Sequence, residues 1–319
     1  MESTLATRSR ADHANRWRAA VRRPRIRTTT RWVGYTALVL AMLVLVDNLL
    51  GFVVYRDGSP RLYVTSAMSG HAAEALVAFP GFVMPGQRLS AAFAAQLPAD
   101  EALVVIGYPG REVDPDAIFT AVMATLHDLD PPRVRLFGAS MGGLVATDFL
   151  TRYLHAGAPY GPVVLVLDTA PSNHTDVKIP GWLFAAAAWY RGGPVASAVW
   201  AMFSRPPDLP EEADTDGRNT NAADHDSAWV GMPAVTGQAR YIRKFHPPAH
   251  EPSGSVTRVA FLQGRDPAND PLVDVANAVA TWRLTFPDLT VVTIESRDGH
   301  WHVPLIQRPR ETLTAILAI

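Results

Sequence analysis

The chain of 319 residues contains no cysteine, which excludes disulfides, thiolate nucleophiles and cysteine-ligated metals. Only 18% of the residues are charged and the formal net charge is −1, which argues against a nucleic-acid partner for the whole chain. The sequence also lacks a G-x-G-x-x-G dinucleotide fingerprint and a calcium-binding loop pattern. We therefore expect no cofactor and no metal. Because 48% of the residues are apolar, the chain has enough material for a large core, and intrinsic disorder is excluded.

Charge is unevenly distributed along the chain. Residues 1–32 hold nine arginines against two acidic residues, a net charge of +7 in this tail. The apolar stretch 33–55 follows directly, and as a helix of 23 residues it would extend about 35 Å, enough to cross a bilayer. Trp32 and Tyr35 at one end and Tyr55 at the other occupy the positions of aromatic belts. The sequence therefore predicts a cytoplasmic tail (1–32) and a single-pass transmembrane anchor (33–55), with the rest of the chain outside the cytoplasm.

Two other interpretations of this N-terminal region remain open. A cleaved signal peptide uses the same basic region and apolar run, although no A-x-A-like cleavage site follows here. A core helix of a soluble protein would also be apolar, but the arginine-rich flank would then have no explanation. We favour the membrane anchor.

From residue 60 onward, short apolar runs alternate with helical patterns. This alternation is typical of an α/β fold in which a mostly parallel sheet has helices on both faces. The expected strands are 75–79, 103–106, 134–137, 163–167, 258–262 and 289–294, and the expected helices are 89–97, 115–128, 141–155 and 272–285.

The alternation is interrupted at residues 169–254, which contain no convincing strand. The segment begins with bulky apolar residues and continues with a polar, acidic stretch, and it is far too long for an ordinary loop. We predict a helical cap inserted into one α/β domain that covers 60–319. The alanine run 185–188 is expected to pack inside this cap.

One motif indicates nucleophilic chemistry. Residues 138–143 read Gly-Ala-Ser-Met-Gly-Gly, directly after the expected strand 134–137 and at the start of the expected helix 141–155. The pattern G-x-S-x-G between a strand and a helix is typical of a nucleophile elbow, where small residues allow the strand and the helix to pack closely. The helix N-terminus would direct N–H groups toward a developing oxyanion. The alternative is a glycine-rich turn with an inert serine.

This motif in this context resembles the α/β-hydrolase superfamily, over roughly residues 60–319. The resemblance implies a nucleophile at Ser140, followed along the chain by an acid and then by a histidine after the last strand. Asp270 matches the family's local acid context, D-P-x-V, but lies six residues past Gly264, whereas Asp266 lies two past it. We favour Asp270 and keep Asp266 as the alternative, with Asp168 a minor option.

The family's C-terminal pattern, G-H-x-P-x-x-E-x-P, can be aligned in two ways. Placing His302 at the histidine matches both prolines, whereas placing His300 there keeps the glycine and loses both prolines. We favour His302 as the base, with His300 as the alternative and a neighbour lining the site. The resemblance also implies an oxyanion hole formed by the N–H groups of Met141 and Phe82, with Gly81 able to replace Phe82.

The implied function is that of a serine hydrolase that cleaves an ester or related acyl bond through an acyl-enzyme. The aromatic residues of the insertion and the anchor favour a small-molecule substrate that is apolar or lipid-like. An acyltransferase on the same scaffold and a non-catalytic binding module remain open, since a fold does not determine a function.

Overall fold

The computed structural model describes residues 31–55, 58–203, 231–249, 256–294, 302 and 309–319. The chain divides into two compact units, the first ending at Leu50 and the second covering Gly51–Ile319. A helix at Arg31–Val54 has 24 residues and is long and apolar enough to cross a membrane, and few of its residues are buried. Its last turn, Gly51–Val54, belongs to the second unit. The expected anchor at 33–55 thus corresponds to a continuous helix, while most of the expected tail lies outside the described residues.

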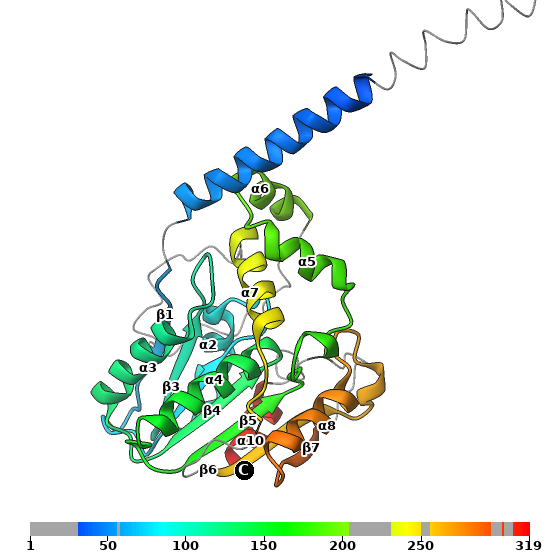
Figure 1. Ribbon diagram of the computed structural model, residues 1–319. Helices are drawn as coiled ribbons and strands as arrows, with labels where there is room; N and C mark the ends of the chain where they lie inside the picture. Colours follow the sequence, from blue (N-terminus) through cyan, green and yellow to red (C-terminus); the bar gives the residue numbers. More distant parts are fainter. Residues whose placement is uncertain (1–30, 56–57, 204–230, 250–255, 295–301, 303–308) are drawn as a thin grey trace, which may run out of the picture. The chain divides into compact units, whose positions relative to one another are not determined.

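The second unit is built on a seven-stranded sheet with the spatial order β1-β3-β2-β4-β5-β6-β7 (Figure 1). All neighbouring strands are parallel except β1, which pairs antiparallel with β3. The strand bounds are β1 Arg61–Thr65, β2 Glu74–Phe79, β3 Glu101–Gly107, β4 Val134–Ala139, β5 Val163–Asp168, β6 Val256–Gly264 and β7 Thr290–Ile294. All six expected strands are present, and β1 is an additional edge strand.

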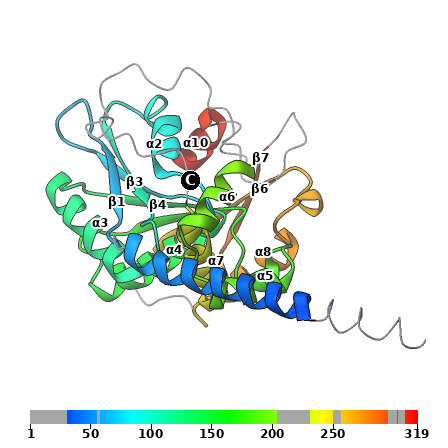
Figure 2. The ribbon, with the colours of Figure 1, turned by 90° about the horizontal axis from the view of Figure 1, so that it is seen from above.

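Helices cover both faces of the sheet, as Figure 2 shows. Side chains of β2 alternate between two apolar clusters, because successive residues of a strand point to opposite faces. Val77 packs with α3 and α4, and Leu76 packs with α2 and α10. The helix bounds are α2 Gly86–Ala94, α3 Pro115–Leu129, α4 Met141–His155, α8 Val275–Thr285 and α10 Pro309–Ala318. The predicted mostly parallel α/β sheet with helices on both faces is therefore confirmed.

Local sequence explains where these helices begin. The carboxylate of Asp114 accepts hydrogen bonds from the N–H groups of Asp116 and Ala117, and Pro115 occupies the first helical position of α3. Helix α4 has no such side-chain cap and begins directly after Ser140. The amino end of α4 therefore remains available to another group.

Among the described residues between β5 and β6, the regular elements are helices and no strand occurs, apart from an isolated bridge at Val177. The elements are the 3₁₀ turn η1 His174–Asp176 and the helices α5 Gly181–Trp189, α6 Pro194–Phe203 and α7 Met232–Lys244. Helix α7 is tied to α5 because the guanidinium of Arg240 donates a hydrogen bond to the carbonyl of Ala187 (2.9 Å). This arrangement agrees with a helical insertion, and its role as a cap stays a prediction. Residues 204–230 and 250–254 of the insertion lie outside the described part.

Trp282 on α8 provides a test of the core. Its ring is fully buried, stacks on Phe286 with centroids 6.1 Å apart, and its indole N–H donates to the carbonyl of Ala170 (3.1 Å). We expect Trp282→Ala to lower the free energy of unfolding by about 3–5 kcal/mol, measured by denaturant titration of the full chain in detergent micelles. Leu284→Ala on the same helix is the control, because Leu284 is 75% exposed and its loss should change stability by less than about 0.5 kcal/mol. Equal effects of the two substitutions would contradict the described packing of α8.

Candidate active site

Ser140 occupies a sharp turn between β4 and α4. Its backbone has φ 49° and ψ −119°, in the left-handed region that a non-glycine residue rarely adopts. The Ser140 N–H donates to the carbonyl of Asp168 at the end of the neighbouring strand β5 (2.8 Å). The turn therefore rests against the carboxyl edge of the sheet.

The glycines around Ser140 are required because the neighbouring backbone leaves no room for a side chain. A Cβ atom on Gly138 would lie 2.5 Å from the Cα of Gly143, and one on Gly142 would lie 1.9 Å from the carbonyl oxygen of Phe79. Helix α4 thus packs directly on the backbone of β4 and on the end of β2. This close approach is the physical reason for the G-x-S-x-G pattern in this chain.

His302 lies between Ser140 and Asp270. Its Nε2 is 3.0 Å from the Ser140 Oγ, and its Nδ1 is 2.9 Å from one carboxylate oxygen of Asp270 and 3.1 Å from the other. The carboxylate is an acceptor, so Nδ1–H donates to Asp270 and Nε2 accepts the hydroxyl proton of Ser140. Three side chains that are far apart in sequence form one hydrogen-bonded series. The imidazole is mostly buried and the Asp270 carboxylate is fully buried.

The loop after β6 brings Asp270, and not Asp266, against His302. The 3₁₀ turn η2, Pro267–Asn269, adds residues between Gly264 and the buried carboxylate, which explains the long offset in sequence. Asp270 Oδ1 also accepts the N–H groups of Leu272 and Val273, both at 2.8 Å, in a local turn typical of aspartate. The Asp266 carboxylate instead accepts a hydrogen bond from Asn269 (2.5 Å).

Asp168 and His300 are the remaining triad candidates from the sequence. Asp168 is fully buried at the end of β5, where its carbonyl supports Ser140 as described above. His300 lies outside the described residues.

The loop after β2 passes beside Ser140. A Cβ on Gly81 would lie 3.4 Å from the Cβ of Ser140 and 3.2 Å from the carbonyl oxygen of Ala139, so the loop lies in close contact with the serine turn. Met141 is the first residue of α4, and its N–H has no acceptor within the helix. Phe82, which follows Gly81, is partly buried. The assignment of the oxyanion donors to Met141 and Phe82 stays a prediction.

Two side chains that sequence reasoning missed hold this loop. The side-chain oxygen of Gln238 on α7 accepts the N–H of Val83 (2.7 Å), and Val83 has a positive φ of 59°. The hydroxyl of Tyr108 donates to the carbonyl of Pro80 (2.9 Å). Burial raises the pKa of Tyr108 well above its usual value, so the phenol keeps the proton that it donates. No local sequence signal points to Gln238, since it lies 155 residues from Val83.

Helix α7 is also fixed to α4, the helix that begins after Ser140. The Tyr241 hydroxyl donates to the Asp148 carboxylate at 2.6 Å. Burial raises the pKa of Asp148, against the lowering effect of this hydrogen bond, and burial together with the Asp148 charge raises the pKa of Tyr241. Gln238 therefore lies on a helix that is bound to the helix that begins directly after Ser140.

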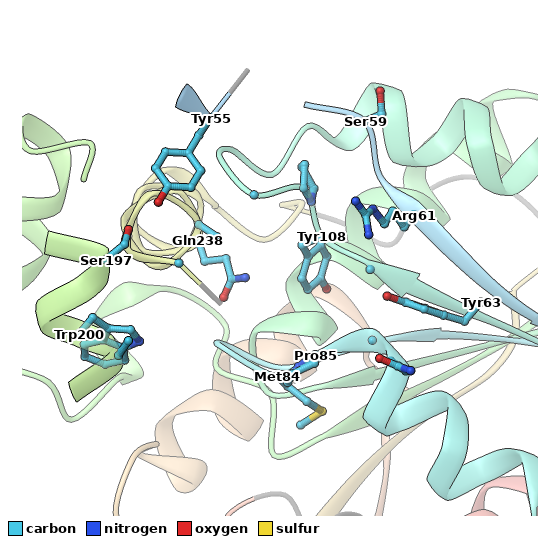
Figure 3. Close-up of a pocket in the computed structure, with 18 of the residues that line it drawn as sticks. Tyr55, Ser59, Arg61, Tyr63, Met84, Pro85, Tyr108, Ser197, Trp200 and Gln238 are labelled. Carbon is cyan, nitrogen blue, oxygen red and sulfur yellow. The ribbon is translucent and has the colours of Figure 1, made fainter. Parts of the chain in front are cut away.

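A cavity of about 470 Å³ lies next to this site. Its walls come from the start of α2, the ends of β1 and β3, helices α6 and α7, and the end of the apolar helix. Figure 3 shows aromatic side chains, among them Tyr55, Tyr108 and Trp200, arranged around the space with Arg61 and Gln238. Two of its lining residues, Met84 and Gln238, belong to or bind the loop that passes beside Ser140, whereas Ser140 itself is not among the lining residues. The volume lies within the range of small-molecule sites in proteins.

Comparisons with known proteins bear on the fold. No protein-family model matches the sequence, and no curated protein matches it. The type II thioesterase BorB from the borrelidin biosynthetic cluster is 19% identical with a TM-score of 0.50, over 82% of this chain and 97% of that one. An esterase from Thermogutta terrifontis is 16% identical with a TM-score of 0.53 (81% and 92%), and the N-acyl homoserine lactonase AidH is 17% identical with a TM-score of 0.50 (82% and 93%).

The chain has the α/β-hydrolase fold. This confirms the expected fold over the described part of residues 60–319. In the α/β-hydrolase fold of this chain, Ser140 follows β4, Asp270 follows β6 and His302 follows β7, all at the carboxyl edge of the sheet. Among the described residues, no group of three or more histidine, aspartate or glutamate side chains is placed to hold a metal ion.

The contact at Gly142 yields a prediction. An added methyl group would meet the Phe79 carbonyl, so the Gly142→Ala variant has to separate α4 from β2. We expect the free energy of unfolding to fall by about 1–3 kcal/mol, measured by denaturant titration. Gly110→Ala is the matched control, since a Cβ at Gly110 meets nothing within 4 Å and should leave stability nearly unchanged. A Gly142→Ala variant as stable as the control would show that the strand and the helix are not in contact there.

Proposed function

We propose that this protein is a serine hydrolase that cleaves an ester or related acyl bond. The observation that carries the proposal is the hydrogen-bonded series from Ser140 Oγ through His302 to the buried Asp270 carboxylate. A hydroxyl, an imidazole and a carboxylate in this order are the groups that acyl transfer by a serine nucleophile requires. The thioesterase, the esterase and the lactonase that share the fold are each named for the cleavage of an acyl bond.

In the first half of the proposed reaction, Ser140 Oγ attacks the carbonyl carbon of the substrate and His302 Nε2 accepts the hydroxyl proton. The carbonyl oxygen becomes an oxyanion, to which the N–H groups of Met141 and Phe82 donate hydrogen bonds. The protonated imidazole then transfers its proton to the leaving oxygen as the bond from the acyl carbon to that oxygen breaks. Asp270 holds the ring in place through Nδ1–H and stabilises its positive charge.

In the second half, water replaces the leaving group. His302 Nε2 accepts a proton from the water as its oxygen bonds to the acyl carbon, and then returns the proton to Ser140 Oγ as the acyl–enzyme bond breaks. The products are a carboxylic acid and the free enzyme.

The cavity next to the site favours an apolar substrate. Aromatic and aliphatic side chains supply much of its wall, which suits an acyl chain or another apolar group. We also propose that the helix Arg31–Val54 anchors the chain in a membrane, with the arginine-rich tail in the cytoplasm and the hydrolase domain outside it. A membrane-anchored enzyme with an apolar cavity is suited to substrates that dissolve in lipid.

Asp270 and Asp266 form a matched pair for testing the triad. We expect Asp270→Asn to lower kcat/KM for a p-nitrophenyl ester by about 10³–10⁴-fold, because the amide cannot stabilise the imidazolium and favours the wrong tautomer of His302. Asp266→Asn removes a carboxylate four residues away that does not contact the imidazole, and should change kcat/KM by less than about twofold. A large loss with Asp266→Asn and none with Asp270→Asn would reverse the assignment.

The cavity predicts a dependence on acyl-chain length. If it binds the acyl chain, kcat/KM should rise about three- to fourfold for each added methylene until the space is filled, since burying a methylene group is worth about 0.8 kcal/mol. Ala201→Trp, which fills the cavity from α6, should remove this rise while activity on the acetyl ester persists. Ala276→Trp, at an exposed position on α8 away from the cavity, is the control. An unchanged chain-length profile in Ala201→Trp would exclude this cavity as the acyl site.

A further inference from the structure

Helices α5 and α6 contain no charged residue, although much of their surface is exposed. Their sequences are Gly-Trp-Leu-Phe-Ala-Ala-Ala-Ala-Trp and Pro-Val-Ala-Ser-Ala-Val-Trp-Ala-Met-Phe. A helix on the surface of a soluble domain normally presents charged or polar residues to water, and an apolar surface of this kind marks a contact with another molecule.

On α5 the exposed side chains follow one face of the helix. Trp182 and Trp189 are 68% and 65% exposed and are seven residues apart, with exposed Ala186 between them. This i, i+4, i+7 spacing puts the three residues on one face. Phe184 and Ala187 are buried on the other face, which is the face tied to α7. The expectation that the alanine run 185–188 packs inside a cap is therefore correct for Ala187 and wrong for Ala185 and Ala186.

Helix α6 repeats the same pattern. Val195, Val199 and Met202 are exposed at i, i+4 and i+7, with Met202 at 79%. Ser197, Trp200 and Ala201 lie on a different face and line the cavity next to the candidate site. Helix α6 therefore separates this cavity from an exposed aliphatic surface.

The connection between α5 and α6 contacts the end of the apolar helix. A Cβ on Gly51 would lie 2.0 Å from the carbonyl oxygen of Gly192, so the two backbones touch. The guanidinium groups of Arg111 and Arg191 lie over the ring of Phe52, at 4.7 and 5.0 Å from its centroid. All these residues belong to the second unit. The point where the apolar helix ends is thus fixed beside α5 and α6.

We propose that the exposed faces of α5 and α6 form a second membrane-contact surface, inserted in the headgroup region of the leaflet from which the chain emerges. The proposal rests on the proposed anchoring by Arg31–Val54, because only a helix that ends at the bilayer surface places its neighbours there. Exposed tryptophans are the side chains best suited to that interface. Arg111, at the end of the apolar helix, carries a charge that anionic headgroups attract, while Arg191 beside it is paired with Glu112. Lipid substrates would then meet α6, whose other face lines the cavity, without leaving the membrane.

The absence of cysteine makes a direct test possible, since each introduced cysteine is a unique labelling site. Single variants Trp189→Cys and Met202→Cys of the full chain are labelled with a nitroxide and reconstituted in vesicles of phosphatidylcholine and phosphatidylglycerol. Collision rates with oxygen, which dissolves in lipid, and with a water-soluble nickel complex give the depth of each label. Val199→Cys provides a further site on α6 if one variant does not fold.

Two reference labels make the result interpretable. Leu284→Cys is a water-exposed control, because Leu284 is 75% exposed near the end of α8, which leads to the amino end of β7 and thus to the opposite edge of the sheet. Leu40→Cys reports the anchor itself. We expect the labels at 189 and 202 to lie roughly 5–10 Å within the headgroup and acyl boundary, and the label at 284 to remain in water.

Three different results would contradict the proposal, and they distinguish its failure from failure of the proposed anchor. Labels at 189 and 202 as accessible to the nickel complex as that at 284, with the label at 40 in lipid, would overturn this proposal and leave the anchor standing. Labels at 189 and 202 that both reagents fail to reach would show that protein, such as a second copy of the chain, covers this surface. A label at 40 in water would refute the anchor, and this proposal with it.

Discussion

The candidate site depends on the His302 imidazole, which contacts both Ser140 and Asp270 although these residues follow different strands. Ser140 follows β4 and Asp270 follows β6, and β5 lies between these strands, so the two strand axes are about 10 Å apart. A single imidazole with one nitrogen at each end bridges this gap only if the serine is turned toward the acid. The positive φ at Ser140 supplies that turn, and the absence of side chains at Gly138 and Gly142 allows it.

Helix α7 connects the rest of the structure to this arrangement. Its Arg240 side chain donates a hydrogen bond to a backbone carbonyl of α5, and its Tyr241 hydroxyl donates to the Asp148 carboxylate on α4. The side-chain oxygen of Gln238 accepts a hydrogen bond from the N–H of Val83. The loop beside Ser140 is therefore held from the helical insertion as well as from the sheet. A displacement of α7 would therefore disturb its hydrogen bonds to both the loop after β2 and α5.

Much of the fold could be predicted from sequence because buried parallel strands read as apolar runs. The edge strand β1 escaped detection since its exposed face breaks that pattern, beginning with the exposed Arg61. The elbow was recognisable because close packing forces glycine at fixed offsets from Ser140. The local D-P-x-V context favours Asp270 over Asp266, while the long offset of Asp270 from Gly264 could not be explained without η2, a 3₁₀ turn that has no strong local signature. Gln238 could not be found at all, because its partner Val83 is distant in sequence and is bound through the backbone.

The most direct test is whether Ser140 is the nucleophile. The folded full-length chain is treated with a fluorophosphonate, which phosphonylates an activated serine with loss of fluoride, and the modified peptide is mapped by mass spectrometry. We expect one adduct, on Ser140, that disappears in Ser140→Ala and forms far more slowly in His302→Ala. An adduct on a different serine, or none on a protein with a native melting transition, would contradict the proposed catalytic role of Ser140.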